Sequence, residues 1–230
     1  MDLLVEGVRR AITLVLAGDR EVLAILVLSI QVSGLATGIA LLLGIPAGAA
    51  LALARFPGRT LLVSAVNTGM GLPPVVVGLF VTLLLWRSGP LGAFEILYTP
   101  TAIVFAQAVI AAPIVTGITL AAVQNVPPAF QLQLVGLGAS RQQMVWWVLK
   151  EARLPMLAAV MAGFGGVISE IGASMMVGGN IKGQTRTLTT AMVLETGKGD
   201  FGVAIALAVL LLLLIFFINW LLTRIQQRAA

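Results

Sequence analysis

The sequence predicts an all-α integral membrane protein with five transmembrane helices. Two observations support this fold class. Of the 230 residues, 59% are hydrophobic and only 10% are charged, whereas a soluble domain carries about 25% charged residues. The hydrophobic residues also form five long runs with few charges, each of which reaches the ~20 residues that a spanning helix requires. Such a chain cannot cover itself with polar side chains, so lipid must surround it.

Short stretches of charged and turn-forming residues separate the five apolar runs. A basic turn, Arg55–Arg59, follows the first run, and Arg87–Pro90 follows the second. We expect spans at residues 22–54, 60–86, 100–123, 154–177 and 202–222. Two Gly-x-x-x-Gly patterns in the first run, starting at Gly34 and Gly44, indicate close helix packing, which we interpret as packing within the chain.

The first 20 residues predict an amphipathic helix that lies in the membrane interface. Val8 and Ile12 share one helical face, whereas Glu6 and Arg9 lie on the other. A polar tail without regular structure is the alternative. These charges also interrupt the apolar core that a signal peptide needs. We expect the membrane domain to occupy residues 21–225 and a cytoplasmic tail to occupy residues 226–230.

Several chemical functions are excluded by the composition. The chain has no cysteine and no histidine, which removes disulfides, thiol nucleophiles, imidazole bases and the usual metal ligands. We therefore expect no catalytic site, no metal and no cofactor. The net charge of +5 is modest and aromatic residues make up 6%, so nucleic acid is not an expected partner.

A polar segment at residues 126–153 predicts two short helices outside the lipid. Prolines in its first turn are tolerated because the N–H groups there lack helical partners. Gly138 can end the first helix in a left-handed conformation. Ser140 and Gln143 form the capping-box pattern that opens the second helix. A capped amphipathic loop that only connects two spans is the alternative interpretation.

The second apolar run contains Asn67 and the pair Pro73-Pro74 near its centre. Two adjacent prolines remove two hydrogen-bond donors and break a helix, and lipid cannot satisfy the freed carbonyls. We interpret this break as part of a water-filled path, with a simple kink as the alternative.

Glu170 is the one charged residue in the fourth run. A carboxylate at membrane depth is costly and therefore indicates function. On a continuous helix, Gly163, Gly166, Ala173 and Ser174 would share its face, and this small-residue stripe would let another helix approach. Two roles remain open: a structural tie to a neighbouring helix, or gating.

The segment 178–190 is rich in hydrogen-bond donors and has no acidic residue. Its donor side chains are Asn180, Lys182, Gln184, Thr185, Arg186, Thr187, Thr189 and Thr190. Such a set suits a tetrahedral oxyanion, although a solvated turn outside the membrane would have the same composition. Gln184 stands where a phosphate-binding loop needs lysine, so the segment is not a nucleotide site.

The polar segment resembles the coupling segment of binding-protein-dependent ABC importer permeases. Gly138-Ala139-Ser140 matches its core, whereas Leu132-Gln133-Leu134 stands where those permeases have Glu-Ala-Ala, and Leu154-Pro155 comes about four residues late. Residues 163–192 are similar to the signature of molybdate, tungstate and sulfate importer permeases, and 71–80 and 88–92 fit the same group. The sequences of residues 150–153, 170–187 and 190–201 are most similar to those of the tungstate branch.

This resemblance implies a type I ABC importer permease core, as in methionine importers (MetI-like). It assigns three groups of site residues by their position in the motifs. Coupling to an ATPase falls to Gly138, Ala139, Ser140, Arg141, Glu151 and Arg153. The residues expected at the path or gate are Asn67, Pro73, Pro74, Glu170 and Ser174. The residues expected in a periplasmic loop that contacts the oxyanion or its binding protein are Asn180, Lys182, Thr185, Arg186 and Thr187.

The resemblance also implies a function: transport of tungstate across the cytoplasmic membrane of a bacterium or archaeon. Molybdate and sulfate are the alternative substrates. The chain itself would not be an enzyme, because ATP hydrolysis would lie in separate ATPase subunits. The other expected partners are a second copy of the chain, a periplasmic or lipid-anchored oxyanion-binding protein, and membrane lipid.

We expect the N-terminus outside the membrane and the C-terminus in the cytoplasm. This orientation follows from a cytoplasmic coupling segment and an odd number of spans. The positive-inside rule does not decide the orientation, because seven basic residues then fall on each side of the membrane. A secondary transporter or channel without an ATPase is the alternative class. It would need several convergent ionisable groups or an inverted repeat, and the sequence indicates neither.

Overall fold

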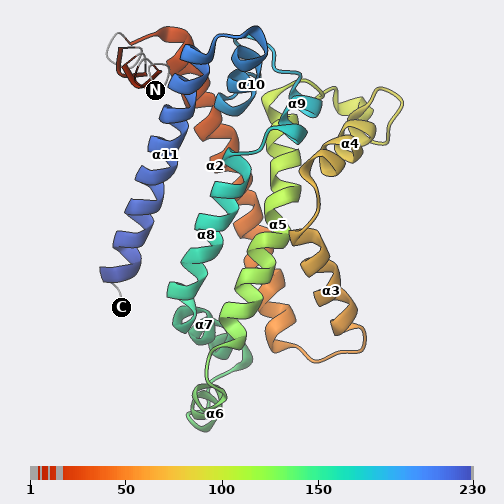
Figure 1. Ribbon diagram of the computed structural model, residues 1–230. Coiled ribbons are helices and arrows are strands. Elements are labelled where there is room, and N and C mark those ends of the chain that lie inside the picture. Colours follow the sequence, from red (N-terminus) through yellow and green to blue (C-terminus); the bar gives the residue numbers. More distant parts are fainter. Residues whose placement is uncertain (1–4, 6, 10, 14–17, 229–230) are drawn as a thin grey trace.

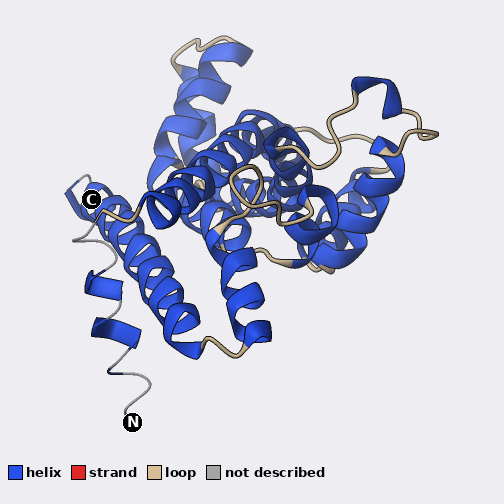
Figure 2. Cartoon of the chain, turned by 90° about the horizontal axis from the view of Figure 1, so that it is seen from above, coloured by secondary structure: helices blue, strands red, loops and turns tan. Residues whose placement is uncertain are grey.

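The computed structural model describes residues 5, 7–9, 11–13 and 18–228, which are helical or looped throughout without a strand (Figures 1 and 2). Of the segment expected as an interfacial helix at 1–20, residues 1–4, 6, 10 and 14–17 lie outside the described residues, and residues 5, 7–9 and 11–13 are helical. Residues 229–230 of the expected tail also lie outside the described residues. The elements are α2 Arg20–Leu53, α3 Arg59–Met70, α4 Pro74–Leu85, the 3-10 helix η1 Gly92–Phe94, α5 Pro100–Gln124, α6 Pro128–Gly136, α7 Arg141–Glu151, α8 Arg153–Ile168, α9 Gly172–Gly178, α10 Leu188–Lys198 and α11 Phe201–Arg228.

Three of the described helices, α2, α5 and α11, are long and apolar enough to cross a bilayer alone. Two bent pairs, α3 with α4 and α7 with α8, raise the number to five if each pair counts as one span by length and composition. The all-α membrane fold is therefore confirmed. The second pair differs from the expected fourth span at residues 154–177, because it includes α7 and leaves out α9. Helix α11 continues to Arg228, so the expected boundary after residue 225 does not coincide with a helix end.

The centre of the molecule is the pair α2 and α5, which run side by side (Figure 1). Gly44 and Gly48 allow this contact, because a Cβ at Gly44 would lie 2.8 Å from Val115 and one at Gly48 would lie 2.5 Å from the Thr116 carbonyl. The second Gly-x-x-x-Gly pattern thus packs within the chain as expected. The first does not: Gly34 and Gly38 are exposed, and a Cβ there would meet nothing within 4 Å.

Helices α3 and α4 form a wedge beside this pair (Figure 1). The chain bends by 102° between them, and Pro74 is the first residue of α4. The predicted break is therefore confirmed. Helix α4 packs on α9, where a Cβ at Gly78 would lie 2.7 Å from the Ala173 Cα. Helix α3 packs on α5 through Gly69 and Pro113, yet none of its residues is buried.

The fourth span is also broken, which the sequence analysis did not predict. Residues 169–171 lie between α8 and α9 and are not α-helical. The expectation that Glu170 shares one helical face with Gly163, Gly166, Ala173 and Ser174 is therefore wrong. Gly166 is exposed, whereas Ala173 and Ser174 are buried in α9. The stripe fails because its two halves belong to separate helices.

The polar segments lie at opposite ends of the helix bundle. Helices α9 and α10 and the loop between them form one end, and α6 and α7 form the other (Figure 1). Helix α11 runs along one side and ends in the half that contains α7. The membrane part of the chain thus separates two candidate docking surfaces.

Candidate functional site

Glu170 lies in the break between α8 and α9 and caps the second helix. Its Oε1 accepts a hydrogen bond from the Ala173 N–H at 2.6 Å, and the residue is 7% exposed. A carboxylate at this position satisfies a backbone donor that the first turn of a helix leaves without a partner. The carboxylate is therefore held by the backbone that follows it.

Side chains from two other helices satisfy carbonyl groups at the same break. Gln107 of α5 donates from Nε2 to the Val167 carbonyl at 3.0 Å. Thr189 of α10 donates from Oγ1 to the Glu170 carbonyl at 2.9 Å. Both side chains are buried. These bonds close the break inside the protein, as an interrupted backbone in a membrane requires.

Gln107 also lies 3.4 Å from Ser174, through Nε2 and Oγ, which places Ser174 within this buried polar group. Sequence reasoning missed Gln107. The available signal was a lone amide in the otherwise apolar run 100–123, since polar side chains within spans tend to be functional.

The break between α3 and α4 has a different environment. Gly71, Leu72 and Pro73 are all exposed, and the hydrogen bonds recorded there are local backbone bonds. For example, Gly71 N–H donates to the Thr68 carbonyl at 3.1 Å and Leu72 N–H to the Gly69 carbonyl at 3.3 Å. No side chain among the described residues closes this break.

The two breaks lie next to each other. A Cβ at Gly172, two residues after Glu170, would lie 2.5 Å from the side chain of Val75, the residue after Pro74. The structure therefore brings the expected path residues Pro73, Pro74, Glu170 and Ser174 to one region, while Asn67 lies one turn before the break on the exposed surface of α3.

The threonines of the loop between α9 and α10 are used inside the protein. Thr185 donates to the Gly178 carbonyl at 2.6 Å and accepts from the Ile181 N–H at 2.9 Å. Thr187 forms a capping box with Thr190 at the start of α10. Thr185 and Thr187 are 1% and 4% exposed. These two hydroxyls shape the loop, so they do not form an open set of donors as the composition suggested.

The cations of this loop pair with an acid that lies far away in the sequence. Lys182 Nζ lies 2.7 Å from Glu21 Oε2, and Arg186 Nη1 lies 3.4 Å from Glu21 Oε1. Arg20 lines the same cavity of about 330 Å³, so three cations face one carboxylate there. Within this cavity positive charge is in excess, which favours an anion or an acidic partner, whereas the adjoining cavity of about 270 Å³ shares Glu21 and Arg186 and adds Asp19 and Glu195. Asn180 lies nearby in the loop and donates from Nδ2 to the Thr190 carbonyl at 3.3 Å.

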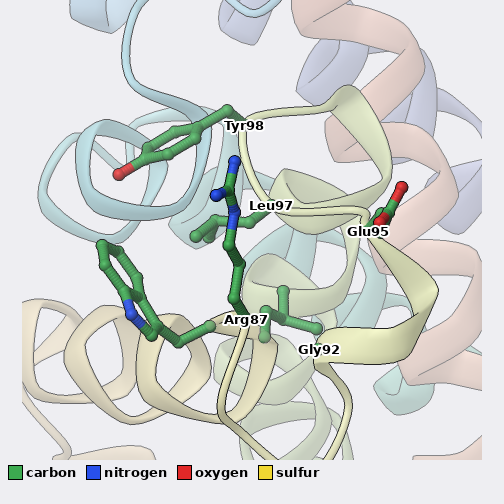
Figure 3. A pocket seen from close by; sticks show the side chains of 7 residues that line it. Arg87, Gly92, Glu95, Leu97 and Tyr98 are labelled. Atoms are coloured by element: carbon green, nitrogen blue, oxygen red, sulfur yellow. The ribbon is translucent and has the colours of Figure 1, made fainter.

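A further cavity of about 480 Å³ lies at the end of α4, lined by Leu85, Trp86, Arg87, Gly92, Glu95, Leu97 and Tyr98. Arg87 extends toward Tyr98, whereas Glu95 points away (Figure 3). Sequence reasoning counted Arg87 only as a charge. No group of three acidic residues in the described part of the chain could hold a metal ion.

The coupling segment has the two helices that were predicted. Gly138 has φ +77°, its N–H donates to the Val135 carbonyl at 2.9 Å, and Ala139 N–H donates to the Leu134 carbonyl at 3.0 Å. These two bonds form a Schellman motif. Ser140 then opens α7 with the predicted capping box. Arg141, Glu151 and Arg153 are exposed, as is Leu137 at the tip with 84%.

Comparison with known proteins identifies the family. Residues 40–230 match the model of the binding-protein-dependent transport system inner membrane component. A probable anion ABC transporter permease of Haloferax volcanii is 40% identical over 89% of this chain and 90% of its own. The tungstate uptake system permease TupB of Peptoclostridium acidaminophilum is 37% identical over 99% of this chain and 100% of its own.

Among solved structures, an inward-facing MetNI methionine ABC transporter has a chain that superposes with a TM-score of 0.71 at 19% identity, covering 92% of this chain and 95% of that one. This match shows the fold. Both relatives are permease proteins, so ATP hydrolysis in their transport systems lies in a separate subunit. By the family model and by its identity to these relatives, the chain belongs to the binding-protein-dependent transport system inner membrane components.

Proposed function

We propose that this chain is the permease subunit of an importer that moves tungstate across the cytoplasmic membrane. The observation that carries the proposal is the 37% identity, over 99% of the chain, to a permease named for tungstate uptake. The positive excess around Lys182 and Arg186 supports an anionic substrate or an acidic docking partner. Molybdate, which has the same charge and nearly the same size, is the second candidate, and sulfate is the third.

Discrimination between these oxyanions lies in the binding protein. Lys182, Arg186 and the backbone of the loop offer charge and hydrogen bonds, which do not distinguish two tetrahedral dianions of similar size. The permease supplies a route that accepts both. The binding protein docks on the end of the bundle that carries α10 and delivers the selected ion.

ATPase subunits bind the opposite end through α6 and α7. The Gly138 turn holds these helices as a rigid knob, and Leu137 protrudes from it. ATP binding draws the knobs of two permease copies together and opens the path outward. A homodimer is supported by the incomplete packing of α3, none of whose residues is buried in a single chain.

The orientation follows from the coupling end. With α6 and α7 in the cytoplasm, the C-terminal end of α11 is cytoplasmic and the start of α2 is outside (Figure 1). The cysteine-free sequence allows a direct test with single thiols. We expect Arg20→Cys to react with an impermeant maleimide in intact cells, and Gln227→Cys to react only after permeabilisation. Reaction of both from outside would contradict the odd number of spans.

Gly138→Val tests coupling. A β-branched residue disfavours positive φ, at a cost of about 1–2 kcal/mol, so the turn between α6 and α7 should deform. We expect the complex to assemble while ATP hydrolysis stimulated by the loaded binding protein falls several-fold. Gly136→Ala is the control, because Gly136 is helical and has open space around it. Normal stimulation in an assembled Gly138→Val complex would remove this turn from the mechanism.

Glu170 is tested by two substitutions. Glu170→Gln keeps an oxygen that accepts from the Ala173 N–H, whereas Glu170→Ala removes the cap at a cost of about 1 kcal/mol. If the role is structural, the Gln variant should keep its melting temperature and its uptake, and the Ala variant should melt earlier. A stable Gln variant without uptake would instead assign Glu170 to the gate.

The substrate is tested in proteoliposomes that contain the permease, its ATPase and its binding protein. We expect uptake of labelled tungstate to be competed far more strongly by unlabelled tungstate than by sulfate. Exchange of the binding protein for one with another preference should shift the competition in the same direction. Transport of a cation or an amino acid by the native complex would refute the proposal.

A further inference from the structure

Helix α3 carries a polar stripe, which consists of Thr60, Ser64, Asn67 and Thr68. At 3.6 residues per turn, these four positions fall within an arc of about 100° on the helix. All four residues are exposed. None has a charged side chain. The Thr68 hydroxyl donates to the Ser64 carbonyl at 2.9 Å within the helix, which leaves the hydroxyl groups of Thr60 and Ser64 and the amide of Asn67 as donors.

The opposite face of α3 packs on the body of the chain. A Cβ at Gly69 would lie 2.8 Å from Pro113 of α5. Leu62 and Val66 line a cavity of about 610 Å³ that residues of α2 and α5 also line. Because the contacts with α2 and α5 occupy this face, the polar stripe points away from the rest of the chain.

The stripe lies at membrane depth. Helices α3 and α4 together are long and apolar enough to form one bent span. The 12 residues of α3 extend about 18 Å from the basic turn at Arg55–Arg59. That length reaches the middle of a hydrocarbon core of about 30 Å. Hydroxyl and amide groups in this position are unfavourable against lipid, and so is the exposed break at residues 71–73.

The two breaks differ in how they are covered. Gln107 and Thr189 close the break between α8 and α9, whereas the described residues provide no such side chain at the break between α3 and α4. A second copy can shield this surface from lipid. The exposed break at residues 71–73 follows the stripe, and an irregular backbone at membrane depth is tolerated beside a water-filled path, which favours a water-filled gap over a tight helix contact.

We propose that the polar stripe of α3 lines the cytoplasmic half of a water-filled path between two copies of the chain, and that the hydroxyl groups of Thr60 and Ser64 and the amide of Asn67 donate hydrogen bonds to the passing oxyanion. This inference rests on the proposed function. Neutral donors suit transit, because a path must bind an ion strongly enough to admit it and weakly enough to release it. Arg55, exposed at the cytoplasmic end of α3, supplies positive charge only where the ion leaves.

Water access to the stripe is tested with single cysteines in inside-out vesicles. We expect Ser64→Cys and Asn67→Cys to react with a charged, impermeant methanethiosulfonate at least about tenfold faster than Val66→Cys, whose side chain lines the apolar cavity on the opposite face. The reaction should also block uptake. Equal rates at the three positions would overturn the proposal. So would rapid disulfide formation between two copies of Ser64→Cys that stay unreactive to the reagent, because that result would indicate a dry contact.

Hydrogen bonding to the ion is tested by removing donors. The double variant Ser64→Ala/Asn67→Leu should transport at least about fivefold fewer tungstate ions per ATP hydrolysed, since it loses two donors. The control is Thr116→Val, which removes a hydroxyl that bonds within α5 at the same depth. A native ratio in the double variant would overturn the proposal. The native complex distinguishes failure of the proposed function from failure of the proposal about the stripe. If the native complex takes up no tungstate, the proposed function itself is refuted.

Discussion

The structure depends on one constraint, the need to satisfy backbone polar groups in a medium that has no hydrogen bonds to offer. Two spans of this chain are broken near their centres, and each break frees groups that lipid cannot pair. In one case Gln107, Thr189 and Glu170 provide the missing partners from within the chain. In the other, between α3 and α4, no side chain of the described residues provides them, and the proposed path would supply water there. This difference separates a closed part of the membrane domain from an exposed one.

The closed part includes the loop between α9 and α10. Glu170 caps α9, Thr185 shapes the loop that follows, and Thr187 begins α10. Thr189 in turn donates to the Glu170 carbonyl, so these bonds tie the α8–α9 break to the loop and to the start of α10. A binding protein docked on this end would therefore contact a preformed surface and not a mobile turn.

Local features were well predicted by the sequence. Pro73-Pro74, the Gly138 turn and the Ser140 capping box depend on the conformational limits of a few adjacent residues, and the structure contains all three. The break at Glu170 was missed because no proline marks it and its bonds come from Gln107 and Thr189, which are distant in the sequence. The ion pairs of Glu21 with Lys182 and Arg186 were missed for the same reason, since Glu21 and Arg186 are 165 positions apart. Gly34 and Gly38 show the opposite error: their spacing predicts packing, but a Cβ at either residue would meet none of the described residues within 4 Å.

The tip of the coupling segment is apolar, and this has a consequence for assembly. Leu132, Val135 and Leu137 are 72%, 60% and 84% exposed, so they offer an apolar surface. Burial of such a surface is driven by the release of water and strengthens with temperature and with excluded salts such as sulfate, whereas an ion pair weakens as salt is added. If an ATPase subunit binds α6 and α7 as proposed, the permease alone would leave this surface exposed. Synthesis of the two subunits in balance would then protect the cell from aggregates of the membrane partner.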